Sequence, residues 1–167
     1  QTNLYHYAGT GHLAVDYARL MQLGFDGLRQ RAQQKLAALD MHDPEFCTKR
    51  EFYQAVLIMY GAVEKYILRY AALAEEMAAR EQEAKRKAEL EQIAANCRAV
   101  AGGAPKTFWQ ALQLFHFATM LICVESNGHS ISYGRMDQWL YPYYEADKGI
   151  SKEFALELLE VEYVKLN

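Results

Sequence analysis

The stretch FYQAVLIMYGAVEKYILRYAALAEEMA, residues 52–78, decides the fold class of this 167-residue chain. Its large apolar residues recur at alternating intervals of four and three positions, the spacing that places side chains on one face of an α-helix. The predicted apolar stripe consists of Phe52, Val56, Met59, Val63, Tyr66, Tyr70, Leu73 and Met77. The sequence therefore predicts a long amphipathic helix and a mainly α chain.

The charged segment EEMAAREQEAKRKAELEQIAANCRAV, residues 75–100, is expected to continue this helix as far as AGGAP at residues 101–105. Pairs such as Glu76 and Arg80 are four residues apart, in the order that supports a helix. Because acidic and basic residues are interleaved, we interpret the segment as a solvated helix face rather than a calmodulin target or a nucleic-acid arm.

Further helices are predicted at about residues 16–39, 108–125 and 137–147, and from residue 151. Thr107 with Gln110 forms a capping box for the second of these, and Ser151 is a suitable N-cap for the last. The segment at residues 126–135 is expected to be a loop or a short strand. The helix at 108–125 is apolar almost all round, which predicts that other chains or other parts of the same chain cover such surfaces.

Composition excludes several classes of function. The formal net charge is −3 and no basic face is evident, so no nucleic-acid partner is expected. No run of 18 apolar residues is present, and the polar start QTNLYHYAGTGH is no signal peptide, so no membrane association is expected. The three scattered cysteines (Cys47, Cys97 and Cys123) are typical of free thiols in a reducing compartment, which predicts a cytoplasmic protein.

The segment around His12 offers a first candidate site. Gly9, Gly11 and Ala14 match the loose dinucleotide fingerprint, but the flanking sequence supplies neither the strand nor the later acidic residue that such a site needs. His12 itself lies between a glycine turn and a helix start, where side chains can face a cavity, and both a structural and a functional role stay open. His116 is predicted to be a hydrogen-bonded core residue. No histidines have metal-ligand spacing, so no metal site is expected.

The second candidate segment follows the apolar helix. Cys123 and Glu125 could suggest thiol chemistry, but Cys123 stands among apolar residues with no basic neighbour, so we assign it to the supporting structure. His129 and Ser130 follow a turn and suit a ligand with several hydroxyl or carboxylate oxygens. Arg135 and Asp137 are expected to pair with each other, to cap the next helix or to touch a ligand.

The segment ESNGHSISYGRMDQWLYPYY at residues 125–144 strongly resembles the substrate-domain signature of glycyl radical enzymes, the pyruvate formate-lyase-like proteins. Supporting similarity covers most of the chain. GHLAVDY (11–17) with LGFDGL (23–28) resembles the family's N-terminal histidine segment. Residues 52–78 resemble its long helix, and APKTFWQALQL (104–114) resembles the approach to the signature.

This resemblance implies that the chain is a fragment, the helical portion of a ten-stranded α/β barrel. Residues 1–167 would form part of a single pyruvate formate-lyase-like domain. The catalytic cysteine loop and the C-terminal glycyl radical domain would both lie outside it. The chain alone would then be inactive. Glu162 departs from the family pattern, because an apolar or aromatic residue is expected at its position.

The resemblance also implies a function for the intact parent protein, a lyase of anaerobic metabolism that uses an organic radical. Dehydration of a small diol or triol of the glycerol type is the first expectation, with His12, His129 and Ser130 as substrate-binding residues and His12 and His129 as possible acid–base groups. Pyruvate formate-lyase-type cleavage of a 2-oxo acid is an alternative, and a non-catalytic helical scaffold is another. No cofactor would be bound directly, since the glycyl radical lies outside this chain. A radical-SAM iron–sulfur activating enzyme would install that radical, and the intact protein would be a homodimer.

Overall fold

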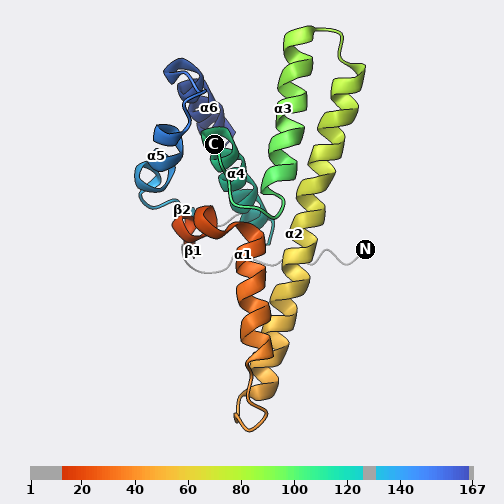
Figure 1. The fold of residues 1–167 in the computed structure, drawn as a ribbon, viewed down its shortest axis with the longest axis vertical. Helices are drawn as coiled ribbons and strands as arrows, with labels where there is room; N and C mark the ends of the chain where they lie inside the picture. Colours follow the sequence, from red (N-terminus) through yellow and green to blue (C-terminus); the bar gives the residue numbers. More distant parts are fainter. Residues whose placement is uncertain (1–12, 126–130, 166–167) are drawn as a thin grey trace. The chain divides into compact units, whose positions relative to one another are not determined.

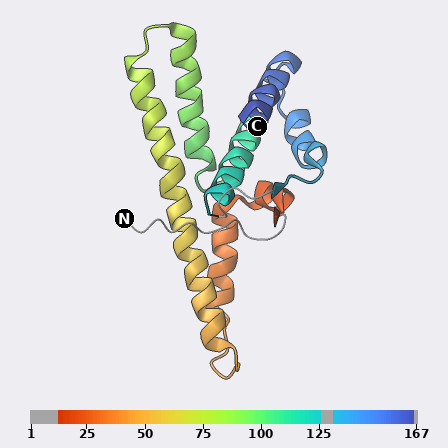
Figure 2. The ribbon, with the colours of Figure 1, turned by 180° about the vertical axis from the view of Figure 1, so that it is seen from behind.

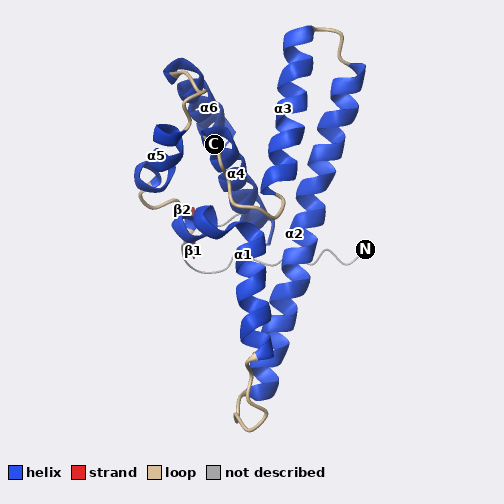
Figure 3. Ribbon diagram, in the orientation of Figure 1, coloured by secondary structure: helices blue, strands red, loops and turns tan. Residues whose placement is uncertain are grey.

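The computed structural model of the chain describes residues 13–125 and 131–165. These residues form two compact units, and each is described by itself. One unit comprises the described residues of 1–18 and 106–167, and the other comprises residues 19–105. Helices make up most of both units (Figure 3), which confirms the prediction of a mainly α chain.

Three helices build the unit of residues 19–105. Helix α1 (Tyr17–Ala37) enters it from residue 19, α2 (Phe46–Arg80) is its longest element, and α3 (Ala84–Val100) folds back alongside α2 (Figures 1 and 2). The ring of Phe25 lies 6.2 Å from that of Tyr60, and Arg29 is 3.0 Å from Glu64, so α1 packs on the first half of α2. Arg98 binds Glu75 at 2.7 Å where α3 returns along the second half.

The predicted continuation of one helix through residues 75–100 is wrong. The chain leaves the helix at Glu81, and Glu83 begins α3 by accepting hydrogen bonds from the backbone N–H groups of Lys85 and Arg86 at 2.9 and 2.5 Å. A carboxylate at this position satisfies amides that have no partner in the first turn of a helix. The predicted pair of Glu76 and Arg80 is confirmed at 2.5 Å.

The predicted long helix over residues 52–78 is confirmed, but its apolar stripe is not the buried face of α2. Among its members Val63 is buried, whereas Phe52 and Leu73 are 62% and 50% exposed. The buried face is instead a row of smaller side chains, Val63, Ile67, Ala71, Ala74 and Ala78. Small residues allow a neighbouring helix to approach closely, and α3 packs on α2. Large apolar side chains therefore remain on the solvent-exposed faces of α2.

Helix α1 is kinked at Gly24, where φ is 61° and ψ is −178°. Just after the kink, the backbone N–H of Asp26 donates to the carbonyl oxygen of Gly102 at 2.7 Å. The turn that follows α3 is therefore fixed against the kink of α1. A break in the helix and a close approach to the backbone of Gly103 thus coincide at this glycine.

The other unit is built around α4 (Phe108–Glu125), which is almost fully buried over its first three turns. Helices α5 (Met136–Ala146) and α6 (Lys152–Lys165) pack on it. The predicted caps are confirmed, because the N–H of Gln110 donates to Thr107 Oγ1 at 3.2 Å and the N–H of Phe154 donates to Ser151 Oγ at 3.1 Å.

Two short strands complete this unit, β1 (Leu13–Ala14) and β2 (Ile131–Ser132). They pair in parallel, with Leu13 opposite Ile131 and Ala14 opposite Ser132, and Figure 1 shows them side by side. Strand β1 was not predicted from the sequence. No helix of the described residues is long and apolar enough to cross a membrane.

Candidate functional site

The strand pair brings the two candidate segments of the sequence together. The predicted substrate-binding residues His12, His129 and Ser130 lie outside the described residues. In the sequence, however, His12 comes directly before Leu13, and His129 and Ser130 come directly before Ile131. Leu13 and Ile131 are partners in the parallel pair. Two segments more than 100 residues apart therefore enter the strand pair at neighbouring positions.

An aromatic cluster lies at the opposite ends of the two strands. Tyr17 follows β1 by three residues, and Tyr133 follows β2 directly. The Tyr17 ring stacks on Trp139 at 5.2 Å between centroids and meets the edge of Phe115 at 5.0 Å. The ring of Tyr133 lies 5.2 Å from that of Phe115. Residues from α1, α4, α5 and the segment after β2 thus share one packed cluster.

A buried hydrogen bond joins this cluster to α4. The hydroxyl oxygens of Tyr17 and Thr119 are 2.8 Å apart, and Tyr17 is 1% exposed. Burial raises the pKa of Tyr17 to about 12, and the bond to Thr119 acts in the opposite direction. Burial also raises the pKa of Tyr133. Burial disfavours the charged form of both phenols, so each stays a neutral hydrogen-bonding group over a wider range of pH than an exposed tyrosine.

Cys123 and Glu125 lie in the last turn of α4, and their assignment to the supporting structure stays a prediction. Cys123 is half-buried. Arg135 and Asp137 bind each other at 2.9 Å, one of the three roles that the sequence left open for them.

Glu162, the residue that departs from the family pattern, is 5% exposed and lies on α6. Its Oε1 atom is 3.1 Å from Nδ1 of His116 on α4. The prediction that His116 is hydrogen-bonded is thereby confirmed, and the unexpected carboxylate is its partner. A buried acidic group needs such a partner, because burial without one is costly. The pair therefore joins α6 to α4.

We expect the single change His116→Leu to destabilise the protein by about 1–3 kcal/mol, because it leaves the buried Glu162 carboxylate without its partner. The double change His116→Leu with Glu162→Leu is expected to recover most of this loss, since neither polar group is then buried. Thermal unfolding of the full-length protein with each variant measures both effects. A double variant that melts no higher than the single one would contradict the proposed pairing.

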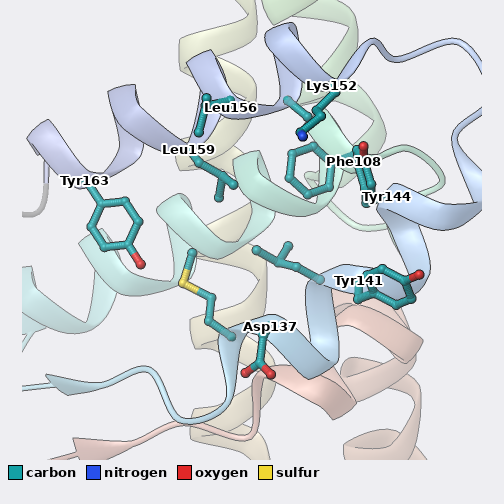
Figure 4. A pocket seen from close by; sticks show the side chains of 11 residues that line it. Phe108, Asp137, Tyr141, Tyr144, Lys152, Leu156, Leu159 and Tyr163 are labelled. Atoms are coloured by element: carbon teal, nitrogen blue, oxygen red, sulfur yellow. The ribbon is translucent and has the colours of Figure 1, made fainter.

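A pocket of about 480 Å³ opens between α4, α5 and α6, and Figure 4 shows the side chains that line it. Its lining consists of Phe108, Met136, Asp137, Leu140, Tyr141, Tyr144, Lys152, Ala155, Leu156, Leu159 and Tyr163. A diol needs several hydrogen-bonding groups that converge on its oxygens. The walls here are mostly apolar, and Asp137 is paired with Arg135. The pocket is therefore poorly suited to a hydroxylated substrate.

The described residues offer no metal centre, since within 13–125 and 131–165 no three or more His, Cys, Asp or Glu side chains group around a possible ion. Sequence reasoning gave no role to five members of the site region: Tyr17, Phe115, Thr119, Tyr133 and Trp139. Tyr17 stands within the GHLAVDY segment and Trp139 within the signature segment, so the resemblance covered both positions but gave neither a role.

Comparisons with known proteins agree with this architecture. The chain is 45% identical to a glycerol-bound B12-independent glycerol dehydratase from Clostridium butyricum, with a TM-score of 0.93 over 97% of this chain and 21% of that one. A glycyl radical enzyme from Archaeoglobus fulgidus has a TM-score of 0.83 and 38% identity over 90% of this chain and 20% of that one. The described helices are thus a helical portion of the glycyl radical enzyme barrel fold.

The family model described as pyruvate formate lyase-like matches residues 1–167, and the chain belongs to this family. It is 63% identical over its whole length to 21% of a (2S)-3-sulfopropanediol dehydratase from Klebsiella oxytoca. It is 40% identical to an isethionate sulfite-lyase from Desulfovibrio desulfuricans, over 89% of this chain and 18% of that protein. The chain spans about a fifth of the length of these relatives.

Proposed function

We propose that the full-length protein containing this chain is a glycyl radical dehydratase of a small vicinal diol, and that residues 1–167 supply part of its substrate pocket. The observation that carries this proposal is the parallel pairing of Leu13 with Ile131, because it joins the segment that contains His12 to the segment that contains His129 and Ser130.

The relatives support dehydration over the alternative reactions. Two of the proteins described above are named as dehydratases of three-carbon substrates with adjacent hydroxyl groups, at 63% and 45% identity. Because the identity is higher to the sulfopropanediol dehydratase, a sulfonated propanediol is our first candidate and glycerol the second.

Dehydration of a vicinal diol defines what the pocket residues must do. A hydrogen atom leaves the carbon that keeps its hydroxyl, and the C–O bond on the neighbouring carbon breaks. The departing oxygen gains a proton and leaves as water. The retained hydroxyl loses its proton and becomes a carbonyl, and a hydrogen atom returns to the carbon that lost its oxygen.

Two proton transfers therefore accompany the radical chemistry. Groups outside this chain would supply the radical. Ser130 would hold a substrate hydroxyl. His12 and His129 would bind hydroxyls and carry the two protons, a role that suits an imidazole near neutral pH.

The remaining organisation of the protein follows from the same proposal. Residues 1–167 would belong to a single pyruvate formate-lyase-like domain, with the cysteine and glycyl loops in other parts of the polypeptide. A radical-SAM activating enzyme would install the radical, and the intact protein would be a cytoplasmic homodimer. The free thiols Cys47, Cys97 and Cys123 support a reducing compartment.

The test uses the full-length protein, activated under strict anoxia and supplied separately with (2S)-3-sulfopropanediol, glycerol and pyruvate. We expect an aldehyde and water from at least one diol, with the sulfonated diol turned over at the higher kcat/KM. Product from pyruvate alone would replace dehydration by C–C cleavage. Failure of the full-length protein to acquire a radical would favour the non-catalytic scaffold, whereas a radical-bearing protein that converts none of the three compounds would overturn the diol assignment.

A further inference from the structure

Strands β1 and β2 are too short to hold their own alignment. Each has two residues, and Leu13 is 44% exposed. Register is specified by the burial of one face and by cooperation among several strands, and both are weak in such a pair. Yet a slip of one residue would displace one strand by about 3.3 Å relative to the other. Another part of the unit must therefore fix the two strands relative to each other.

The aromatic cluster described above has the contacts needed for this. Tyr17 begins α1, and its own backbone N–H donates to the carbonyl oxygen of Val15 at 2.9 Å, next to β1. Its hydroxyl is bonded to Thr119 in the middle of α4. Tyr17 thereby connects the end of β1 to the buried helix α4 through two hydrogen bonds, one from its backbone and one at its hydroxyl.

Strand β2 is connected to the same cluster. The indole Nε1–H of Trp139 donates to the carbonyl oxygen of Tyr133 at 3.2 Å, and Tyr133 directly follows β2. The Trp139 ring stacks on Tyr17 with an interplanar angle of 26°. Both strands are therefore connected to the same cluster of aromatic rings. Phe115 and Thr119 connect that cluster to α4.

Packing and hydrogen bonding do different work in this cluster. Contact between rings holds these side chains together and favours stacked or edge-to-face arrangements, but it does not select one atom as a partner. A hydrogen bond is directional and fixes the position of the group that makes it. The bond between Tyr17 and Thr119 is thus the part of the cluster that sets where the first turn of α1, and with it β1, lies along α4.

We infer that Tyr17 and Thr119 are positioning residues for substrate binding: their hydrogen bond fixes β1 against β2 and so sets the affinity of the full-length enzyme for its diol. This inference rests on the proposed function, because it takes the diol as the ligand whose affinity changes.

The experiment compares four variants of the full-length, activated enzyme on the diol that the wild type turns over. Tyr17→Phe and Thr119→Val remove the hydrogen bond and keep the packing volume, whereas Thr119→Ser keeps the hydroxyl. Tyr60→Phe is the matched control, since it removes the hydroxyl of a tyrosine in the other unit whose ring packs on Phe25. The readouts are KM, kcat and the melting temperature.

We expect Tyr17→Phe and Thr119→Val each to raise KM about tenfold, a loss typical of modest misplacement of binding groups. Thr119→Ser and Tyr60→Phe should remain within about twofold of wild type, as expected when no positioning bond is lost. Two variants that remove the bond from opposite sides keep the test decisive if one of them does not fold.

Two results would overturn the inference and are distinguishable from each other. If Tyr17→Phe and Thr119→Val lower the melting temperature or kcat and leave KM unchanged, the bond serves stability alone. If the wild type binds and converts neither diol, the proposed function fails, and the inference fails with it.

Discussion

The full-length enzyme with His129→Ala is expected to lose about 10²–10⁴-fold in kcat/KM for its diol, because under the proposed function the change would remove a hydrogen-bonding group and a proton carrier from the substrate pocket. The reason is the position of His129 in the sequence, two residues before the strand residue that pairs with Leu13. Steady-state kinetics of the activated enzyme under anoxia measure the loss.

Two further variants make this prediction specific. His129→Gln keeps a hydrogen-bonding side chain but cannot carry a proton near neutral pH, so we expect it to restore KM more than kcat. His42→Ala is the matched control, because His42 is exposed in the loop between α1 and α2. Turnover by His129→Ala within threefold of wild type would remove His129 from the pocket.

Gly24→Ala is expected to have the largest effect on stability, a loss of about 2–5 kcal/mol from backbone strain and overpacking together. With φ at 61° and ψ at −178°, the residue occupies a region that is nearly restricted to glycine. A Cβ atom at this position would also collide with the backbone of Gly103 and Ala104. Thermal unfolding and the folded yield of the full-length protein measure the loss.

Gly61→Ala offers a control of the opposite sign. Gly61 lies within α2, and a Cβ atom there would meet nothing within 4 Å. Alanine favours a helix over glycine by about 1 kcal/mol, so this variant should melt slightly higher than wild type. If Gly24→Ala unfolded at the same temperature as Gly61→Ala, the strain assigned to the kink would be wrong.

The sequence predicted the helices well and their packing faces poorly. Periodicity locates α2, and the length of its apolar run together with the Thr107–Gln110 capping box locates α4. Periodicity fails at residues 81–83, where no glycine or proline marks the end of α2. The break is instead made by Glu83, whose side chain caps the start of α3. It also fails on the buried face of α2, since hydrophobic patterns select large side chains whereas α3 packs against Ala71, Ala74 and Ala78.

The candidate site could be predicted only in part, because its strands are short and its hydrogen bonds join residues that are distant in the sequence. A strand of two residues has no measurable period, so β1 could not be found by pattern. The bond between Tyr17 and Thr119 joins residues 102 positions apart, and that between His116 and Glu162 joins residues 46 apart. His116 and Glu162 were each noted separately, but nothing local in a sequence states which distant residues are neighbours. The family resemblance supplied what periodicity could not.

The alanine row on α2 has a consequence for how sequences of this family can diverge. Where α3 packs on α2, residues 71, 74 and 78 are almost completely buried, so any larger side chain would force the two helices apart. Neutral drift at these three positions should be confined to glycine, alanine and serine. The exposed positions beside them, such as Leu73, are not subject to this constraint and can vary more. In related sequences we therefore expect the buried face of this helix to vary less than its exposed face.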